Sequence, residues 1–178
     1  MTTSLEVRGI GHSTRDAASF LALIGRHQIE AVADIRRFPG SKRLPHFSSE
    51  ALASRLSEAG VDYIWMPALG GRRRPVPGAP DTAWRVSGFR GFADYLQTPE
   101  FAAALDELVN LAGGFRTVVM CAEALWWRCH RRLIADVLVS LGVAVSHITD
   151  RGAEPHRLMS PARLVDGVLS YAPEPSAA

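Results

Sequence analysis

Short runs of β-branched and aliphatic residues alternate along the chain with stretches in which apolar residues recur every three or four positions. The first pattern is typical of buried strands, and the second of helices with one buried face. Five strands are predicted, at residues 7–11, 31–35, 61–66, 117–121 and 143–148. Helices are predicted from about Ser13, from Ser48 or Ser49 to Gly60, around Phe92 to Leu96, from Thr98 to Gly113, and from about Trp127 to Leu141.

Strands that alternate with helices favour a mostly parallel sheet covered on both faces. The predicted fold class is therefore α/β: a single domain over residues 1–171, with a mostly parallel five-stranded sheet and helices on both faces, Rossmann-like or rhodanese-like. Residues 172–178 are expected to form a frayed tail. Segment 67–88 contains four prolines and four glycines, which predicts a long irregular loop, and the chain is expected to be irregular again after Ile148.

The composition narrows the class of protein. A length of 178 residues fits one domain, and 47% hydrophobic with 21% charged residues is an ordinary globular balance. No apolar run approaches the roughly 20 residues that span a bilayer, so no membrane partner is expected. The N-terminus lacks the pattern of a signal peptide, and there are two cysteines, so we expect a cytoplasmic protein without disulfides.

Positive charge is concentrated in one part of the chain. The net charge is +2, yet the segment from Asp34 to Arg90 carries ten basic and five acidic residues. Nearly all the cations are arginines, whose planar fork suits phosphates, and aromatic residues such as Phe38 and Trp84 are interleaved with them. Cations that hold phosphates beside rings that stack on bases are typical of sites for single-stranded or flipped nucleotides. The alternative is an arginine-rich solvated surface with aromatic residues in the core.

Ligands of parallel sheets bind beyond the carboxyl ends of the strands, and two carboxylates follow such ends in this sequence. Glu123 comes after the predicted strand 117–121 and is flanked by tryptophans, so we expect it to be partly desolvated, with a raised pKa suited to acid/base catalysis. Asp34 is the second carboxylate. The alternative is that Asp34–Arg36 and Glu123–Arg131 are ion pairs that only brace loops.

Cys121 ends a predicted strand, and Cys129 and His130 follow near the start of a helix. A thiol among cations at a helix N-terminus would be nucleophilic. The arrangement is similar to the active-site loop of rhodaneses, although that loop contains glycine and this one contains Leu125-Trp126-Trp127. Zinc binding by these three residues with His12 or His46 is an alternative, but no zinc spacing is matched, and Cys129 and His130 also fall on the apolar helix face. No metal and no other cofactor is therefore predicted.

Several motifs together resemble one known family. The glycine-bearing turn from Gly9 to Thr14 and the run Leu69-Gly70-Gly71-Arg72 could each present backbone N–H groups or cations to an anion. Seven motifs carry this resemblance: Gly11-His12-Ser13-Thr14, residues 32–41, Pro45-His46-Phe47, Leu69-Gly70-Gly71-Arg72, residues 89–95, Met120-Cys121-Ala122-Glu123-Ala124 and Trp127-Arg128-Cys129-His130-Arg131. Through them the chain is similar to the domain of unknown function 488 family, over about residues 10–157. It implies that these separate motifs form one site.

The predicted function is that of an enzyme acting on a phosphate-bearing substrate, a nucleic acid or a nucleotide, by base modification or N-glycosidic bond cleavage. The alternatives are a rhodanese-like sulfurtransferase that forms a Cys121 persulfide, and a non-catalytic module that binds nucleic acid or protein. The catalytic candidates are Glu123, Asp34 and Cys121. The substrate-binding candidates are His12, Ser13, Arg15, Arg36, Arg37, Arg43, His46, Phe47, Tyr63, Gly70, Gly71, Arg72, Phe89, Arg90, Asp94, Trp127, Cys129, His130 and Arg131.

Overall fold

The computed structural model describes residues 5–40, 42–80 and 82–174. Its centre is a six-stranded sheet in the order β3-β2-β4-β1-β5-β6, in which all neighbours pair in parallel except β5 with β6. The strands are β1 (Glu6–Gly11), β2 (Ala31–Asp34), β3 (Asp62–Trp65), β4 (Thr117–Cys121), β5 (Ala144–Thr149) and β6 (Gly152–Pro155). A separate hairpin is formed by β7 (Arg163–Val165) and β8 (Val168–Ser170). The structure is therefore a single mixed α/β domain with a Rossmann-like fold.

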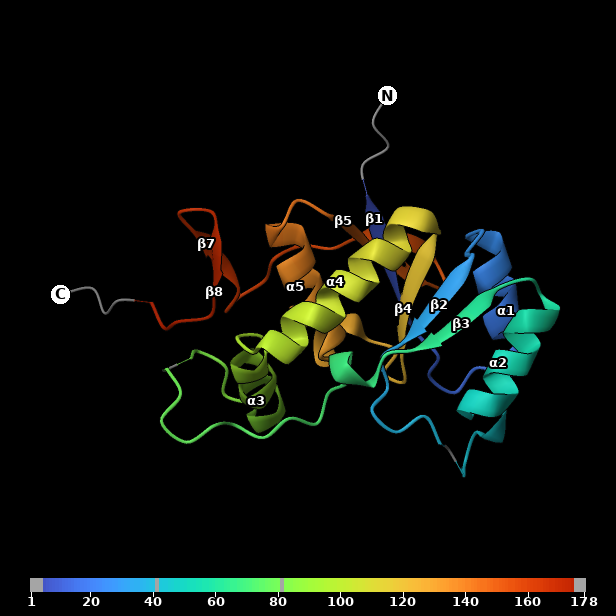
Figure 1. Ribbon diagram of the computed structural model, residues 1–178, viewed down its shortest axis with the longest axis horizontal. Helices are drawn as coiled ribbons and strands as arrows, with labels where there is room; N and C mark the ends of the chain where they lie inside the picture. The colour runs from blue at the N-terminus through green and yellow to red at the C-terminus, as the bar shows by residue number, and fades with distance from the viewer. Residues whose placement is uncertain (1–4, 41, 81, 175–178) are drawn as a thin grey trace.

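Helices cover both faces of the sheet, as predicted (Figure 1). One face packs against α1 (Ala17–Arg26) and α2 (Ser49–Glu58), through a core that contains Phe20, Leu56 and Phe47. The other face packs against α3 (Ser87–Tyr95), α4 (Pro99–Gly114) and α5 (Arg131–Ser140). Strands β1 to β5 alternate between these two cores, since successive side chains of a strand point to opposite faces. The register places Asp34 beside Met120 and hence on the α1/α2 face, whereas Cys121 lies on the α5 face.

Side-chain caps begin three of the helices. Asp16 accepts a hydrogen bond from the backbone N–H of Ser19, Ser48 accepts one from Ala51, and Thr98 accepts one from Phe101 ahead of Pro99. These caps satisfy N–H groups that have no partner within the helix. The predicted starts of α2 and α4 are thus confirmed. The helix predicted from about Ser13 begins later, at Ala17, because Asp16 and not Ser13 is its cap.

Three predictions about regular structure are wrong. The sheet has six strands because Gly152–Pro155 pairs antiparallel with β5, so the chain is not irregular after Ile148. The last helix begins at Arg131, because residues 126–128 form a separate 3-10 turn and Cys129 is extended. Segment 67–88 is not irregular throughout, since it opens with a 3-10 turn at Pro67–Leu69 and its end belongs to α3. Part of the predicted C-terminal tail, residues 175–178, lies outside the described residues.

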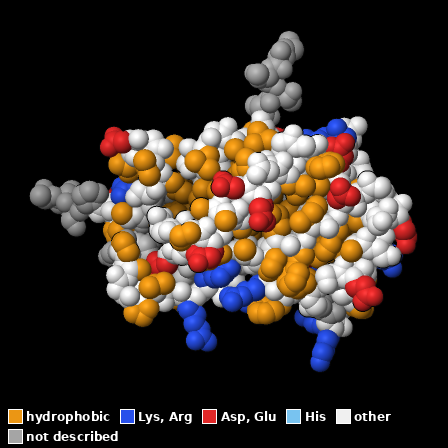
Figure 2. All heavy atoms as spheres, viewed as in Figure 1, with side chains coloured by type: hydrophobic (Ala, Val, Ile, Leu, Met, Phe, Trp, Pro, Cys, Tyr) orange, Lys and Arg blue, Asp and Glu red, His pale blue; other side chains and the backbone are white. Residues whose placement is uncertain are grey.

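The strand order places the carboxyl end of β4 at a switch point. The chain leaves β1 and β2 toward the α1/α2 face, and it leaves β4 toward α5 on the opposite face, although β4 lies between β1 and β2. Neighbouring connections that diverge in this way open a crevice, where ligands bind in α/β sheets. Lys and Arg side chains gather on the lower edge of the molecule in Figure 2, toward which the ends of β2, β3 and β4 point in Figure 1. Among the described residues, no helix is long and apolar enough to cross a membrane.

Candidate functional site

The turn after β1 is hydrogen-bonded to the end of β4 and the loop that follows it, at the switch point. The N–H groups of His12 and Ser13 donate to the carbonyls of Cys121 and Ala122, both at 2.9 Å. A Cβ atom on Gly11 would collide with the backbone carbonyl of Glu123, so glycine is required at that position for the two segments to come together. This close approach fixes the position of Cys121 at the end of its strand.

Cys121, Cys129 and His130 form one cluster between the end of β4 and the start of α5. Their sulfur and ring nitrogen atoms all lie within 4.8 Å of one another, and Cys129 Sγ is 3.6 Å from His130 Nδ1. Both cysteines are buried and free of disulfides. The cluster is therefore preassembled by the fold, as the resemblance implied for these two motifs.

The imidazole of His130 is held between two neighbours. Phe92 of α3 lies on one side, with ring centroids 5.1 Å apart. Gly71 lies against the ring face, because a Cβ atom there would be 2.8, 3.0 and 3.2 Å from Nδ1, Cγ and Cε1. Any larger residue at position 71 would displace the ring, which explains one glycine of the Leu69–Arg72 run.

The two thiols of the cluster differ in acidity. A hydrogen bond from the Cys129 thiol, with further help from the His130 ring and the Arg131 charge, holds the pKa of Cys121 well below its ordinary value despite burial. The same hydrogen bond to Cys121, together with burial, raises the pKa of Cys129. Cys121 is therefore the more acidic thiol of the pair.

A pocket of about 180 Å³ opens over this cluster. Its lining combines residues of and beside the cluster with cationic and aromatic side chains: Cys121, Ala122, His130, Gly71, Arg36, Arg37, Phe38 and Arg72. Phe38 is 65% exposed, and the guanidinium carbons of Arg37 and Arg72 lie 5.8 and 5.9 Å from its ring centroid. The pocket thus combines the Cys121 thiol and the His130 imidazole with cations and an exposed aromatic ring.

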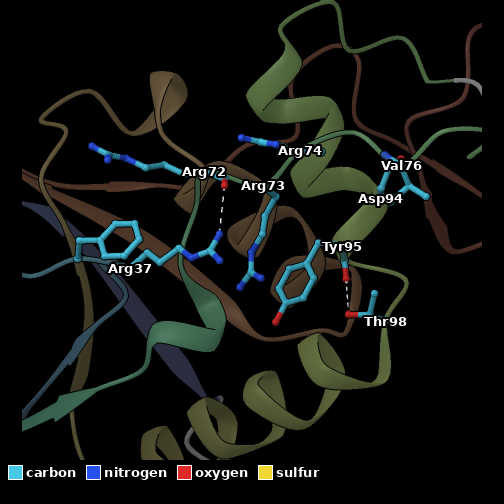
Figure 3. A pocket seen from close by; sticks show the side chains of 10 residues that line it. Arg37, Arg72, Arg73, Arg74, Val76, Asp94, Tyr95 and Thr98 are labelled. Atoms are coloured by element: carbon cyan, nitrogen blue, oxygen red, sulfur yellow. Dashed lines mark hydrogen bonds between the residues drawn. The ribbon is translucent and has the colours of Figure 1, made fainter.

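A second pocket, of about 540 Å³, adjoins the first, because both are lined by Arg37, Phe38 and Arg72 (Figure 3). The Arg37 guanidinium donates to the Arg72 carbonyl at 3.2 Å, and Arg73 lies over the Tyr95 ring at 3.6 Å from its centroid. Arg74 also lines this space. The two pockets, which we call the arginine groove, together present five arginines: Arg36, Arg37, Arg72, Arg73 and Arg74.

Asp34 lies on the opposite face of the sheet from Cys121 and is completely buried. It accepts hydrogen bonds from Arg36 Nε at 2.9 Å and Arg36 Nη2 at 2.6 Å, and from the Tyr63 hydroxyl at 2.7 Å. The Asp34–Arg36 ion pair weighed as an alternative is therefore present. Burial and the Asp34 carboxylate raise the pKa of Tyr63. Tyr63 consequently braces Asp34.

His12 belongs to the same side as Asp34. Its ring stacks on Phe47 with centroids 4.1 Å apart, and its Nε2 is 3.4 Å from Arg36 Nη1. Burial, with a contribution from the Arg36 charge, lowers the pKa of His12. Arg36 also donates to the Phe47 carbonyl at 2.7 Å, so these predicted site residues form a buried network behind the pocket.

The prediction that Glu123 is partly desolvated is wrong. The loop after β4 turns the Glu123 side chain to solvent, where it is exposed and accepts a hydrogen bond from the N–H of Leu125 at 3.1 Å. The predicted Glu123–Arg131 ion pair is replaced by a bond from Arg131 to the Glu123 backbone carbonyl at 2.8 Å. Trp127, expected beside this carboxylate, is 40% exposed and packs edge-on against Trp126.

Several other candidates lie away from the cluster. Phe89 packs on Trp84, and Arg90 lines a separate pocket of about 400 Å³ with Arg85. The remaining positions are as follows: Arg43 is exposed, Asp94 accepts from the N–H of Val76 at 2.8 Å, Arg15 pairs with Asp150 at 2.9 Å, His46 bonds the Arg15 carbonyl at 2.9 Å, Ser13 has a φ of 51°, and Gly70 packs on Arg37.

Among the arginine and aromatic residues of the arginine groove, four were missed as site residues: Phe38, Arg73, Arg74 and Tyr95. Phe38 stands directly after Arg36-Arg37, and Arg73 directly after Arg72, so adjacency to predicted cations was the available signal. Tyr95 carried no such signal, since its approach to Arg73 depends on how α3 packs.

Fold and site define a Rossmann-like α/β protein with a thiol–imidazole cluster at the floor of an arginine-lined pocket. The chain belongs to the family described as Domain of unknown function DUF488, which matches residues 16–138. The resemblance drawn from the motifs is thereby confirmed, although the motif at 11–14 falls just outside the match. Neither the curated proteins nor the solved structures compared with the chain contain a match.

Proposed function

We propose that this protein is an enzyme that acts on a phosphate-bearing substrate, a nucleotide or a single-stranded nucleic acid, bound in the arginine groove. The observation that carries the proposal is the exposed Phe38 ring between Arg37 and Arg72, at the opening of the pocket that contains Cys121 and His130. Arginine forks bind phosphates, and an exposed ring stacks on a base.

The reaction belongs at the cluster on the floor of the pocket. A phosphate held by Arg37 and Arg72, with its base on Phe38, would place the nucleoside over Cys121 and His130. Base modification or N-glycosidic cleavage is the class of reaction that this placement favours. Among the described residues that line the pocket, neither Asp34 nor Glu123 is included, so the proposal assigns the chemistry to the cluster and not to a carboxylate.

Binding of labelled single-stranded and duplex oligonucleotides across a salt series tests this proposal. The logarithm of affinity falls with the logarithm of salt by roughly 0.7 to 0.9 per phosphate contact. Arg72→Ala should weaken binding and reduce that slope by about one contact. Arg55→Ala, an exposed arginine on α2, is the matched control and should leave the slope unchanged. Absence of binding at low salt, or equal slopes for Arg72→Ala and wild type, would refute the proposal.

Sulfur transfer is the second candidate, favoured by the acidic Cys121 thiol in a pocket that attracts anions. The Cys121 thiolate would attack the outer sulfur of thiosulfate, form an S–S bond and release sulfite, before passing that sulfur to an acceptor thiol. Mass spectrometry after incubation with thiosulfate measures the intermediate directly. One added sulfur atom on Cys121 supports this candidate, and an unchanged mass refutes it.

A further inference from the structure

We propose that Cys121, Cys129 and His130 bind a zinc ion, with one coordination position open to the arginine-lined pocket. Two thiolates and an imidazole are the donors that zinc prefers, and three protein ligands with a free position are typical of catalytic zinc sites. The sequence spacing of these residues matches no zinc motif, because the fold and not a local loop brings them together.

The distances agree with ligation. Zinc–sulfur bonds of about 2.3 Å and zinc–nitrogen bonds of about 2.0 Å place the donors of a tetrahedral site roughly 3.5–3.8 Å apart. Cys129 Sγ and His130 Nδ1 are 3.6 Å apart, and all three donor atoms fit within 4.8 Å. An ion can therefore be accommodated with shifts of an ångström or less.

The protein holds these donors in place. The backbone N–H of Arg131 donates to Cys129 Sγ at 3.5 Å, which holds this sulfur at the start of α5. Gly71 and Phe92 fix the imidazole of His130. Its Nδ1 faces Cys129 Sγ and is the nitrogen placed to bind a metal, whereas Nε2 makes no hydrogen bond within the described part of the chain. A rigid imidazole that holds Nδ1 beside two thiols is a preorganised set of donors for zinc.

The fourth position faces the pocket. The two histidines considered as a fourth ligand are occupied elsewhere, since His12 Nδ1 lies 2.9 Å from the Ser13 carbonyl and His46 Nε2 lies 2.9 Å from the Arg15 carbonyl. Cys121 and His130 themselves line the pocket. Water or an anion could therefore reach the ion from the arginine groove. The last step rests on the proposed function: water bound to the ion would then lie beside the substrate.

The test uses the full chain, purified with reduced thiols and treated with a chelator. Titration with Zn²⁺ against a colorimetric chelator should show one equivalent bound, and Co²⁺ should give the near-ultraviolet absorption of cobalt–thiolate bonds. Cys129→Ser and His130→Gln should each weaken zinc binding about a hundredfold or more, since even residues behind the ligands contribute up to about that much. His27→Gln, at the residue that follows α1, is the matched control and should bind like wild type.

The cobalt spectrum of the wild type decides the question even if a variant does not fold. Lack of cobalt–thiolate absorption, or zinc binding that is equal in folded Cys129→Ser and wild type, overturns the site. A persulfide on Cys121 in a chain that binds no zinc also overturns it and favours sulfur transfer. Zinc binding without oligonucleotide binding would instead confirm the ion and refute the proposed function, so the two failures are distinguishable.

Discussion

Asp34→Asn would leave the buried guanidinium of Arg36 without its ionic partner. The Asp34 side chain is 0% exposed, and the Arg36 side chain is 7% exposed. The Asp34 carboxylate accepts three hydrogen bonds from Nε and Nη2 of Arg36 and one from the Tyr63 hydroxyl. Breaking a buried ion pair in this way costs about 3–5 kcal/mol. For a domain of this size, each kcal/mol lowers Tm by about 2–4 °C, so a decrease on the order of 10 °C is expected.

Urea and thermal unfolding followed by circular dichroism measure this loss. Asp62→Asn, an exposed aspartate on β3, is the matched control and should change the free energy of unfolding by about 0.5 kcal/mol or less. The double variant Asp34→Asn/Arg36→Met should recover much of the loss, because no unpaired buried charge remains. If Asp34→Asn is as stable as wild type, the carboxylate does not brace Arg36, and a catalytic role for Asp34 would again have to be considered.

Three further predictions concern the pocket and the core. Gly71→Ala should displace the His130 ring and weaken zinc binding about 10- to 100-fold in a competition titration, and unchanged affinity would contradict the packing argument. Phe38→Ala should weaken binding of a single-stranded oligonucleotide by about 1–3 kcal/mol in fluorescence anisotropy, whereas Phe115→Ala, also exposed, should not. Burial, aided by neighbouring positive charge, lowers the pKa of His147 to about 3, so the unfolded chain takes up its proton first. Stability should therefore fall as pH drops below about 6.5, by up to about 1.4 kcal/mol per unit, and His147→Gln should flatten urea-unfolding profiles between pH 6 and 4.

The strands that could be predicted from the sequence are those whose residues form a continuous apolar run. Residues 117–121 are apolar apart from Thr117, and every one of them is buried in the structure. β6 could not be found this way, because Gly152–Pro155 is short, largely exposed and begins with glycine. Its pairing is dictated by β5 and the turn between them, which is a tertiary effect. Local propensity likewise did not separate the 3-10 turn at residues 126–128 from the helix that follows.

The sequence could predict that candidate residues gather at one end of the sheet, but not on which face of the sheet each side chain lies. The rule that ligands bind at the carboxyl ends of strands led us to group Cys121, Arg37 and Arg72, and these three residues line one pocket. Asp34 and Cys121 also both end strands, yet the pairing of Asp34 with Met120 places their side chains on opposite faces of the sheet. That register depends on the alignment of β2 with β4, which no segment specifies alone. The prediction that Glu123 is partly desolvated was wrong for a related reason, since the turn after β4 decides which way the Glu123 side chain points.

The position of β1 in the sheet limits where the chain can be truncated for expression. The family match covers residues 16–138, whereas β1 ends at Gly11 and lies at the centre of the sheet between β4 and β5. A fragment trimmed to the matched residues would expose the inner edge of β4, with unpaired backbone groups that promote aggregation. It would also lack Gly11 and His12, which contact the end of β4 and the loop after it and so hold Cys121 in position. Expression boundaries for this protein should therefore be set by strand pairing and not by the limits of sequence similarity.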